Sequence, residues 1–142
     1  MKNLKIKVID LISYFFIMLF CYAGISKLMD FENFQLQILS TFIPSAFLKI
    51  IPITIIISEF LIAGLLCYKN TRNIGLIGSF TLMSIFTSYI IVILSTSENL
   101  PCSCGGILEK MSWHQHLYFN IGCIILSVVA LVLNTKYSRP AE

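Results

Sequence analysis

The sequence predicts an all-α integral membrane protein, a single four-helix transmembrane domain over residues 1–142. Hydrophobic residues make up 57% of the chain and charged residues 12%, whereas a soluble domain has about 25% charged residues. Four apolar stretches approach the roughly 20 residues that cross a bilayer, at about residues 8–28, 47–68, 74–94 and 113–133. Helices are expected because open strands could not satisfy their backbone hydrogen bonds in lipid. The basic residues are scattered, which argues against nucleic acid as a partner.

The first span is too long for a cleaved signal peptide and lacks a small-x-small cleavage site, so we expect a retained helix. It ends in "AGISKLMDF", where Lys27 can reach the aqueous surface or turn inward to an acid. A short interfacial amphipathic helix should follow between helices 1 and 2, with Asp30 as its N-cap and Pro44 after its end. Its apolar residues recur near helical spacing, at Phe31, Phe34, Ile38 and Phe42. This segment is either a connector or a lid over a site between the helices.

The second span carries Glu59, an acid near the middle of an apolar helix and therefore a functional candidate. Glu59 lies about 12 residues below the expected outer end of this span, farther than a lysine side chain reaches. A direct bond to Lys27 would need the second helix to begin late or to tilt. We therefore expect Glu59 to be protonated and hydrogen-bonded to another polar group inside the bundle. Small residues along the spans should let neighbouring helices approach closely: Ala23, Gly24, Ala63, Gly64, Gly75, Gly78 and Gly122.

The distribution of basic residues predicts the orientation of the chain. With four spans, the N-terminus, the link between the second and third spans and the C-terminus lie on one side. Seven of the ten Lys and Arg residues fall on that side: Lys2, Lys5, Lys7, Lys69, Arg72, Lys136 and Arg139. Cytoplasmic segments are enriched in such residues, so we expect a bacterial inner-membrane protein with both termini in the cytoplasm. The two long links would then face the oxidising periplasm, where disulfides persist.

The link before the fourth span, "ENLPCSCGGILEKMSWHQH", contains the most specific chemistry of the sequence. Cys102 and Cys104 can close a small, strained disulfide ring, and strained exposed disulfides exchange readily. So short a ring would remove little chain entropy, which disfavours a purely structural staple. Gly105 and Gly106 allow close backbone approach beside the pair. The segment therefore favours thiol–disulfide chemistry.

Two other interpretations of this link stay open, a metal site and an inert cysteine-containing turn. Thiolates and one histidine suit zinc or copper. However, His114 and His116 would point about 200° apart on a helix, so both cannot easily join one site. Because Cys102 and Cys104 with one histidine give only three ligands, we assign no metal ligands. His116 is instead a candidate proton acceptor for a thiol.

The fourth span should begin at Trp113, because Ser112 and Gln115 match the S-x-x-Q capping box. The aromatic residues of its first turns are most simply interfacial anchors, but they could also border a quinone pocket. Cys21 and Cys123 each lie about 10 Å below the outer surface, so a second redox pair is geometrically conceivable. Single cysteines in membrane helices more often pack as small apolar residues.

With these motifs in place, the chain resembles the MauE/DoxX-type redox-associated membrane proteins, in particular the methylamine utilisation protein MauE branch. The resemblance covers nearly the whole chain, and its most specific part is "PCSCGG" followed by "SWHQHLYFN". The matching positions are Gly24, Lys27, Glu59, Cys102, Cys104, Trp113 and Asn120. The resemblance implies a four-helix bundle of the kind used by membrane disulfide oxidoreductases that reduce quinone. It also implies maturation of a disulfide-rich periplasmic protein beside a thioredoxin-like partner, although the C-x-x-C pair of the quinone-coupled enzymes is absent here.

The sequence thus predicts an inner-membrane thiol–disulfide redox protein that acts on a periplasmic thioredoxin-like or disulfide-containing protein. Its catalytic candidates are Cys102 and Cys104, with Glu59 or His116 handling protons, and a quinone is its candidate cofactor. If the chain is an enzyme, it is a thiol–disulfide oxidoreductase. The alternatives are a non-enzymatic assembly or chaperone subunit with a structural C-x-C loop, and a metal-handling membrane protein.

Overall fold

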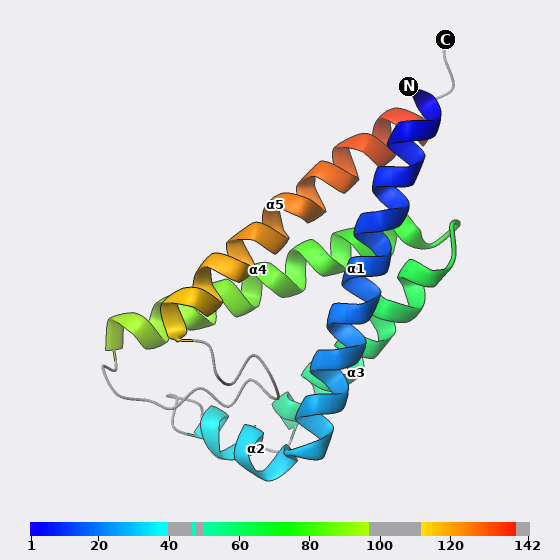
Figure 1. The fold of residues 1–142 in the computed structure, drawn as a ribbon. Helices are drawn as coiled ribbons and strands as arrows, with labels where there is room; N and C mark the ends of the chain where they lie inside the picture. Colours follow the sequence, from blue (N-terminus) through cyan, green and yellow to red (C-terminus); the bar gives the residue numbers. More distant parts are fainter. Residues whose placement is uncertain (40–46, 48–49, 97–111, 139–142) are drawn as a thin grey trace.

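The computed structural model describes residues 1–39, 47, 50–96 and 112–138. Within these ranges the chain is helical and contains no strand. The helices, drawn in Figure 1, are α1 (Lys2–Met29), α2 (Phe31–Leu39), α3 (Ile50–Cys67), α4 (Arg72–Thr96) and α5 (Trp113–Ser138). All but α2 are long and apolar enough to cross a membrane. The expected all-α architecture of four spanning helices, with a short helix between the first two, is confirmed.

The four long helices form two pairs, α1 with α3 and α4 with α5, and α3 joins the pairs by packing against α4. The pairs meet near the two chain termini and diverge toward α2 (Figure 1). We call these the terminal end and the α2 end. The main core lies between the pairs and is built largely from Phe16, Phe20, Leu66, Leu76, Met83, Cys123 and Ala130.

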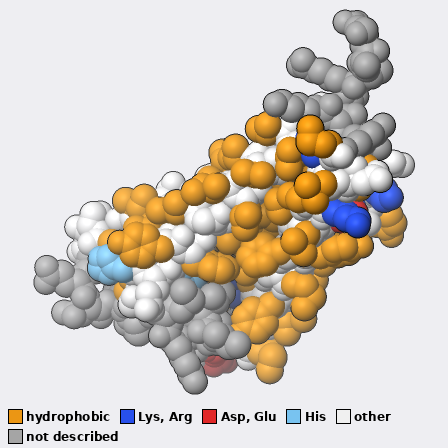
Figure 2. Space-filling model, turned by 45° about the horizontal axis from the view of Figure 1, so that its top comes forward, with side chains coloured by type: hydrophobic (Ala, Val, Ile, Leu, Met, Phe, Trp, Pro, Cys, Tyr) orange, Lys and Arg blue, Asp and Glu red, His pale blue; other side chains and the backbone are white. Residues whose placement is uncertain are grey.

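Large apolar side chains also cover the outside of the long helices. Examples from each are Leu11, Ile57, Ile85 and Ile125, all more than half exposed. The space-filling view shows one such face, which is dominated by hydrophobic side chains (Figure 2). A water-soluble monomer rarely exposes continuous apolar patches of such extent. These surfaces are suited to contact with lipid, as the composition predicts.

Polar contacts hold the terminal end together. Arg72, at the start of α4, donates from Nη1 to Asp10 Oδ1 of α1 over 2.6 Å. Asn134 of α5 donates to Asn73 of α4 over 3.3 Å. The short connection from α3 to α4 closes through Thr71, whose hydroxyl donates to the Leu65 carbonyl over 2.7 Å. These contacts fix the ends of α1, α4 and α5 relative to one another.

Glycine determines how closely α3 and α4 approach. A Cβ atom at Gly75 would lie 2.9 Å from the Leu66 side chain and 3.0 Å from its backbone nitrogen. At Gly78 it would lie 3.0 Å from Ile62. The expected close approach at these two residues is therefore observed. Gly64 of α3 and Gly122 of α5 have nothing within 4 Å of the corresponding position, so the expectation that they serve close packing is wrong.

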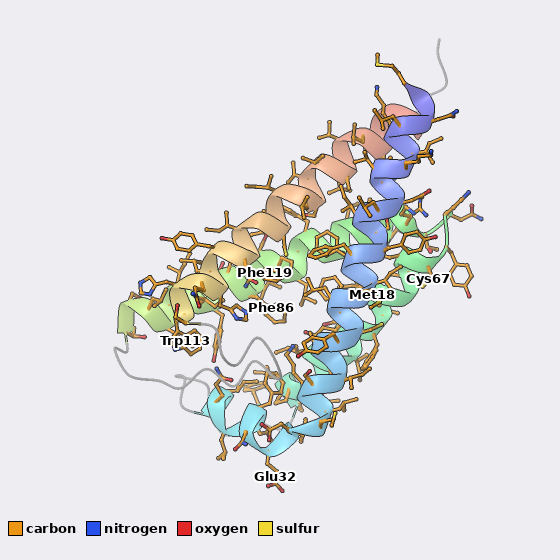
Figure 3. The ribbon with its side chains drawn as sticks, viewed as in Figure 1. Met18, Glu32, Cys67, Phe86, Trp113 and Phe119 are labelled. Atoms are coloured by element: carbon orange, nitrogen blue, oxygen red, sulfur yellow. The ribbon has the colours of Figure 1, made fainter. Side chains whose placement is uncertain are left out.

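The short helix α2 follows α1 almost directly and covers the α2 end of α3. Its buried side chains Phe34 and Ile38 pack against Ile56 of α3, forming a second, smaller core. Phe31 also packs against this core, whereas Glu32 points away from the bundle (Figure 3). The amphipathic pattern thus identifies the inward face over residues 31–38. Phe42 and Pro44 lie outside the described residues.

Candidate functional site

The most unusual feature of the interior is an ion pair between Lys27 and Glu59. Lys27, in the last turn of α1, donates from Nζ to Glu59 Oε1 over 2.6 Å. The lysine side chain is 8% exposed and the glutamate side chain 0%. The expectation that Glu59 would bond to a group other than Lys27 is therefore wrong. An ion pair this deeply buried is uncommon, because each charge loses its hydration.

The short helix α2 explains why Lys27 turns inward. Its side chains Phe34 and Ile38 cover this end of the bundle, so the lysine does not extend to the surface. From the last turn of α1, the side chain instead reaches Glu59 on α3, the helix against which α1 packs.

Two aromatic rings complete the surroundings of the lysine. The Nζ atom lies 5.7 Å from the ring centre of Phe34 on α2 and 5.5 Å from that of Phe86 on α4. Both distances fall within the range of cation–π attraction. One ammonium group therefore contacts four helices: its own α1, α2 through Phe34, α3 through Glu59 and α4 through Phe86.

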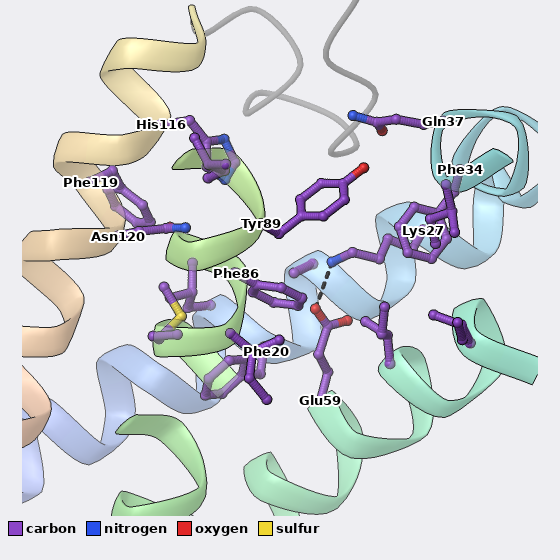
Figure 4. A pocket seen from close by; sticks show the side chains of 18 residues that line it. Phe20, Lys27, Phe34, Gln37, Glu59, Phe86, Tyr89, His116, Phe119 and Asn120 are labelled. Atoms are coloured by element: carbon purple, nitrogen blue, oxygen red, sulfur yellow. Dashed lines mark hydrogen bonds and ion pairs between the residues drawn. The ribbon is translucent and has the colours of Figure 1, made fainter. Parts of the chain in front are cut away.

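This ion pair borders a cavity of about 280 Å³ at the α2 end. All five helices contribute to its wall, which is mostly apolar. Its aromatic residues are Phe20, Phe34, Phe86, Tyr89 and Phe119, and its other polar residues besides the ion pair are Gln37, His116 and Asn120. The close-up view shows these polar groups distributed around the cavity, with the ion pair on the side of α1 and α3 (Figure 4).

The start of α5 sets the direction of two of these polar groups. The expected capping box is present: the Ser112 backbone N–H donates to Gln115 Oε1 over 3.0 Å, and the Gln115 backbone N–H donates to Ser112 Oγ over 3.3 Å. This arrangement fixes the beginning of α5 at Trp113. His116 and Asn120, one turn apart, consequently share the inward face of α5 and are 8% and 1% exposed.

Three buried polar atoms of this site lack a hydrogen-bond partner within the described part of the chain. They are Glu59 Oε2, His116 Nδ1 and Asn120 Nδ2. A buried polar atom without a partner costs about 1–3 kcal/mol, and more if it is charged. In a largely apolar cavity, such atoms mark positions where a bound molecule or water can be held.

The structure brings together two of the four predicted catalytic residues, Glu59 and His116, in the wall of one cavity. Cys102 and Cys104 lie outside the described residues. His114 is exposed, which agrees with the expectation that the two histidines point in different directions. The resemblance pointed to Asn120 without assigning it a role. The sequence signal for it is an amide side chain at a position otherwise surrounded by apolar residues.

Metal and second-disulfide interpretations gain no support from the described residues. Over these ranges no cluster of His, Cys, Asp or Glu could hold a metal ion. Cys21, Cys67 and Cys123 are free thiols. Cys123 is buried in the main core, and Cys21 packs against that core, as expected for cysteines that act as small apolar residues.

The fold and site together define a multi-pass helical membrane protein with a buried ion pair at the edge of a mostly apolar cavity. Comparison with known families identifies its group more closely. The chain belongs to the family described as methylamine utilisation protein MauE, whose profile matches residues 5–133. No curated protein and no solved structure gives a significant match.

Proposed function

We propose that the chain is a thiol–disulfide oxidoreductase of the bacterial inner membrane that acts on a periplasmic thioredoxin-like or disulfide-containing protein. Cys102 and Cys104 are its redox pair. The observation that supports this most is the location of polar groups able to handle protons. The link containing the cysteines joins α4 to α5, and His116, in the first turn of α5, borders the cavity whose opposite side carries the Lys27–Glu59 pair (Figure 4).

The reaction is a two-step thiol–disulfide exchange. A thiolate of the reduced partner attacks the Cys102–Cys104 disulfide and forms a mixed disulfide with one of the two sulfurs. The second thiol of the partner then attacks this mixed disulfide, which leaves the partner oxidised and Cys102 and Cys104 as a dithiol. Two electrons pass to the membrane protein. The reverse sequence of the same steps reduces the partner instead.

His116 acts on protons in this proposal, and the Lys27–Glu59 pair positions the wall of the site. The Nδ1 atom of His116 has no partner in the described ranges, and the His116 side chain lines the cavity. A neutral imidazole accepts a proton near physiological pH, as a thiol requires when it becomes a thiolate. Glu59 is held by Lys27, so its role is to fix the ammonium between α1 and α3.

The experiment that tests this function is the trapping of a mixed disulfide in cells. We expect Cys104→Ser or Cys102→Ser, whichever retains the sulfur that bonds to the partner, to accumulate a partner adduct that a reductant removes. The remaining thiolate attacks the partner's disulfide, and the variant lacks the second cysteine that would resolve the mixed disulfide. The matched control is Cys67→Ser, which lies near the terminal end and should leave trapping unchanged. If neither single variant forms an adduct and the double variant leaves periplasmic disulfides unaltered, the chain is not an oxidoreductase. A C-x-C pair that stays oxidised in strong reductant would identify a structural loop in an assembly subunit.

The proposal also requires a defined orientation in the membrane. Both termini and the α3–α4 connection would face the cytoplasm, and α2 with the cysteine-containing link would face the periplasm. The concentration of Lys and Arg at the terminal end supports this orientation. Reporter fusions after residue 138 and within residues 97–111 test it. Activity of a cytoplasmic reporter in the link would exclude periplasmic exchange.

A further inference from the structure

We propose that the cavity at the α2 end binds a neutral, lipid-soluble ring that carries carbonyl oxygens, a molecule of the quinone class. The binding site is defined by Lys27, Asn120 and His116 on opposite sides of the cavity (Figure 4). The role of this ligand as electron acceptor rests on the proposed thiol–disulfide function, whereas its binding does not.

The charges of the cavity select a neutral ligand. Lys27 and Glu59 neutralise each other across 2.6 Å, and they are the only charged residues in the cavity wall formed by the described chain. A ligand with its own net charge would enter a mostly apolar space without a free counter-charge, at a high cost in hydration. An uncharged molecule that already resides in the lipid avoids this cost.

The unpaired polar atoms select hydrogen-bond acceptors on that ligand. Asn120 Nδ2 is an amide nitrogen with donors to offer and no partner in the described chain. The ammonium of Lys27 carries three N–H groups, of which the bond to Glu59 uses one. Carbonyl oxygens on one ring would accept from these two sides. His116 Nδ1 can donate to the same group or accept from its reduced, hydroxyl form.

The walls and size of the cavity fit a ring. Phe20, Phe86 and Phe119 present flat apolar surfaces on which an unsaturated ring can stack. A volume of about 280 Å³ far exceeds the roughly 30 Å³ that one water molecule occupies in the liquid. The space suits a small ring system whose substituents extend toward lipid.

A quinone also matches the electron requirement of the proposed exchange. When Cys102 and Cys104 close to a disulfide, the dithiol releases two electrons and two protons. A bound quinone supplies an acceptor for both electrons and both protons and leaves as the hydroquinone. His116 lies on the cavity wall where it can relay one of these protons.

Binding of decylubiquinone to the purified full-length protein in dodecyl maltoside micelles tests this inference. Quenching of Trp113, the single tryptophan of the chain, reports saturable binding near the start of α5. We expect Asn120→Leu and His116→Phe each to weaken the saturable component at least fivefold. The matched controls are Asn134→Leu, near the far end of the same helix, and His114→Phe, an exposed histidine two residues from His116. Both should stay within twofold of the unsubstituted protein.

Several outcomes decide the inference. Dodecylbenzene, which has a ring and a tail but no carbonyl, should compete only weakly with decylubiquinone. It should bind Asn120→Leu and the parent protein with equal affinity. Equal binding of both probes would show a hydrophobic tail site and overturn the proposal. The same conclusion follows if Asn120→Leu and Asn120→Ala, each with parental far-UV circular dichroism, bind decylubiquinone normally. Cys102→Ser/Cys104→Ser should bind with unchanged affinity. If the unsubstituted protein binds decylubiquinone but shows no thiol exchange, the proposed function alone is refuted.

Discussion

Replacing Lys27 by methionine tests the energetic role of the buried ion pair. The variant leaves Glu59, whose side chain is fully buried, without its partner. Removing one member of such a pair costs about 3–5 kcal/mol, because an uncompensated charge remains inside the protein. At about 1.4 kcal/mol per tenfold change, the ratio of folded to unfolded protein should fall roughly 140- to 3,700-fold.

The double variant Lys27→Met/Glu59→Leu separates the charge effect from the packing effect. It removes both charges and leaves apolar side chains of similar volume, a change that is often neutral or stabilising. The double variant should therefore recover most of the stability lost in Lys27→Met. The loss of the cation–π contacts to Phe34 and Phe86 should be limited, because methionine also packs favourably against aromatic rings.

The Arg72–Asp10 pair at the terminal end provides a control with the same 2.6 Å separation. Its side chains are 13% and 31% exposed, so water screens these charges better than those of Lys27 and Glu59, and Arg72→Met should cost less than Lys27→Met. Unfolding by sodium dodecyl sulfate in mixed micelles, followed by far-UV circular dichroism, measures all three variants. Equal losses for Lys27→Met and Arg72→Met, or a double variant as unstable as Lys27→Met, would refute the reasoning.

Three further predictions concern packing, capping and thiol access. Gly75→Ala should destabilise the protein by about 1–3 kcal/mol in the same unfolding assay, because the added Cβ meets Leu66. Gly122→Ala should be neutral or slightly stabilising. Similar losses of stability at both positions would contradict this packing. Ser112→Ala should cost about 1 kcal/mol through loss of the capping box, and Ser112→Asp should retain most of it. In a Cys102→Ser/Cys104→Ser background, a maleimide should label the exposed Cys67 far faster than the buried Cys123 in the folded protein. Comparable labelling rates would show that the main core is open.

Much of the architecture follows from the sequence because membrane helices are governed by simple constraints. The apolar stretches predicted the four spans, and the capping box predicted the beginning of α5 at Trp113. The amphipathic spacing predicted the inward face of α2. These features depend on local residues, so they can be recognised without knowledge of distant contacts.

The ion pair could not be derived from the sequence because it depends on how α1 and α3 lie relative to each other and on what covers Lys27. Hydropathy predicts the two spans but not how far one is shifted along the other. The inward turn of Lys27 further requires α2 to occupy the surface that the side chain would otherwise reach. Asn120 illustrates the same limit, since its polarity was visible but its position in a cavity wall depends on three-dimensional packing.

The buried ammonium of Lys27 has a consequence for the order in which the chain assembles. Lys27 is synthesised 32 residues before Glu59, so α1 enters the membrane while its lysine has no counter-charge. During that interval the long side chain is best accommodated by extending to the aqueous surface. We expect it to swing inward only after α3 has been inserted, and α2 can settle over it only then. Amine-directed labelling of Lys27 in a chain truncated before α3 would detect this surface-exposed side chain.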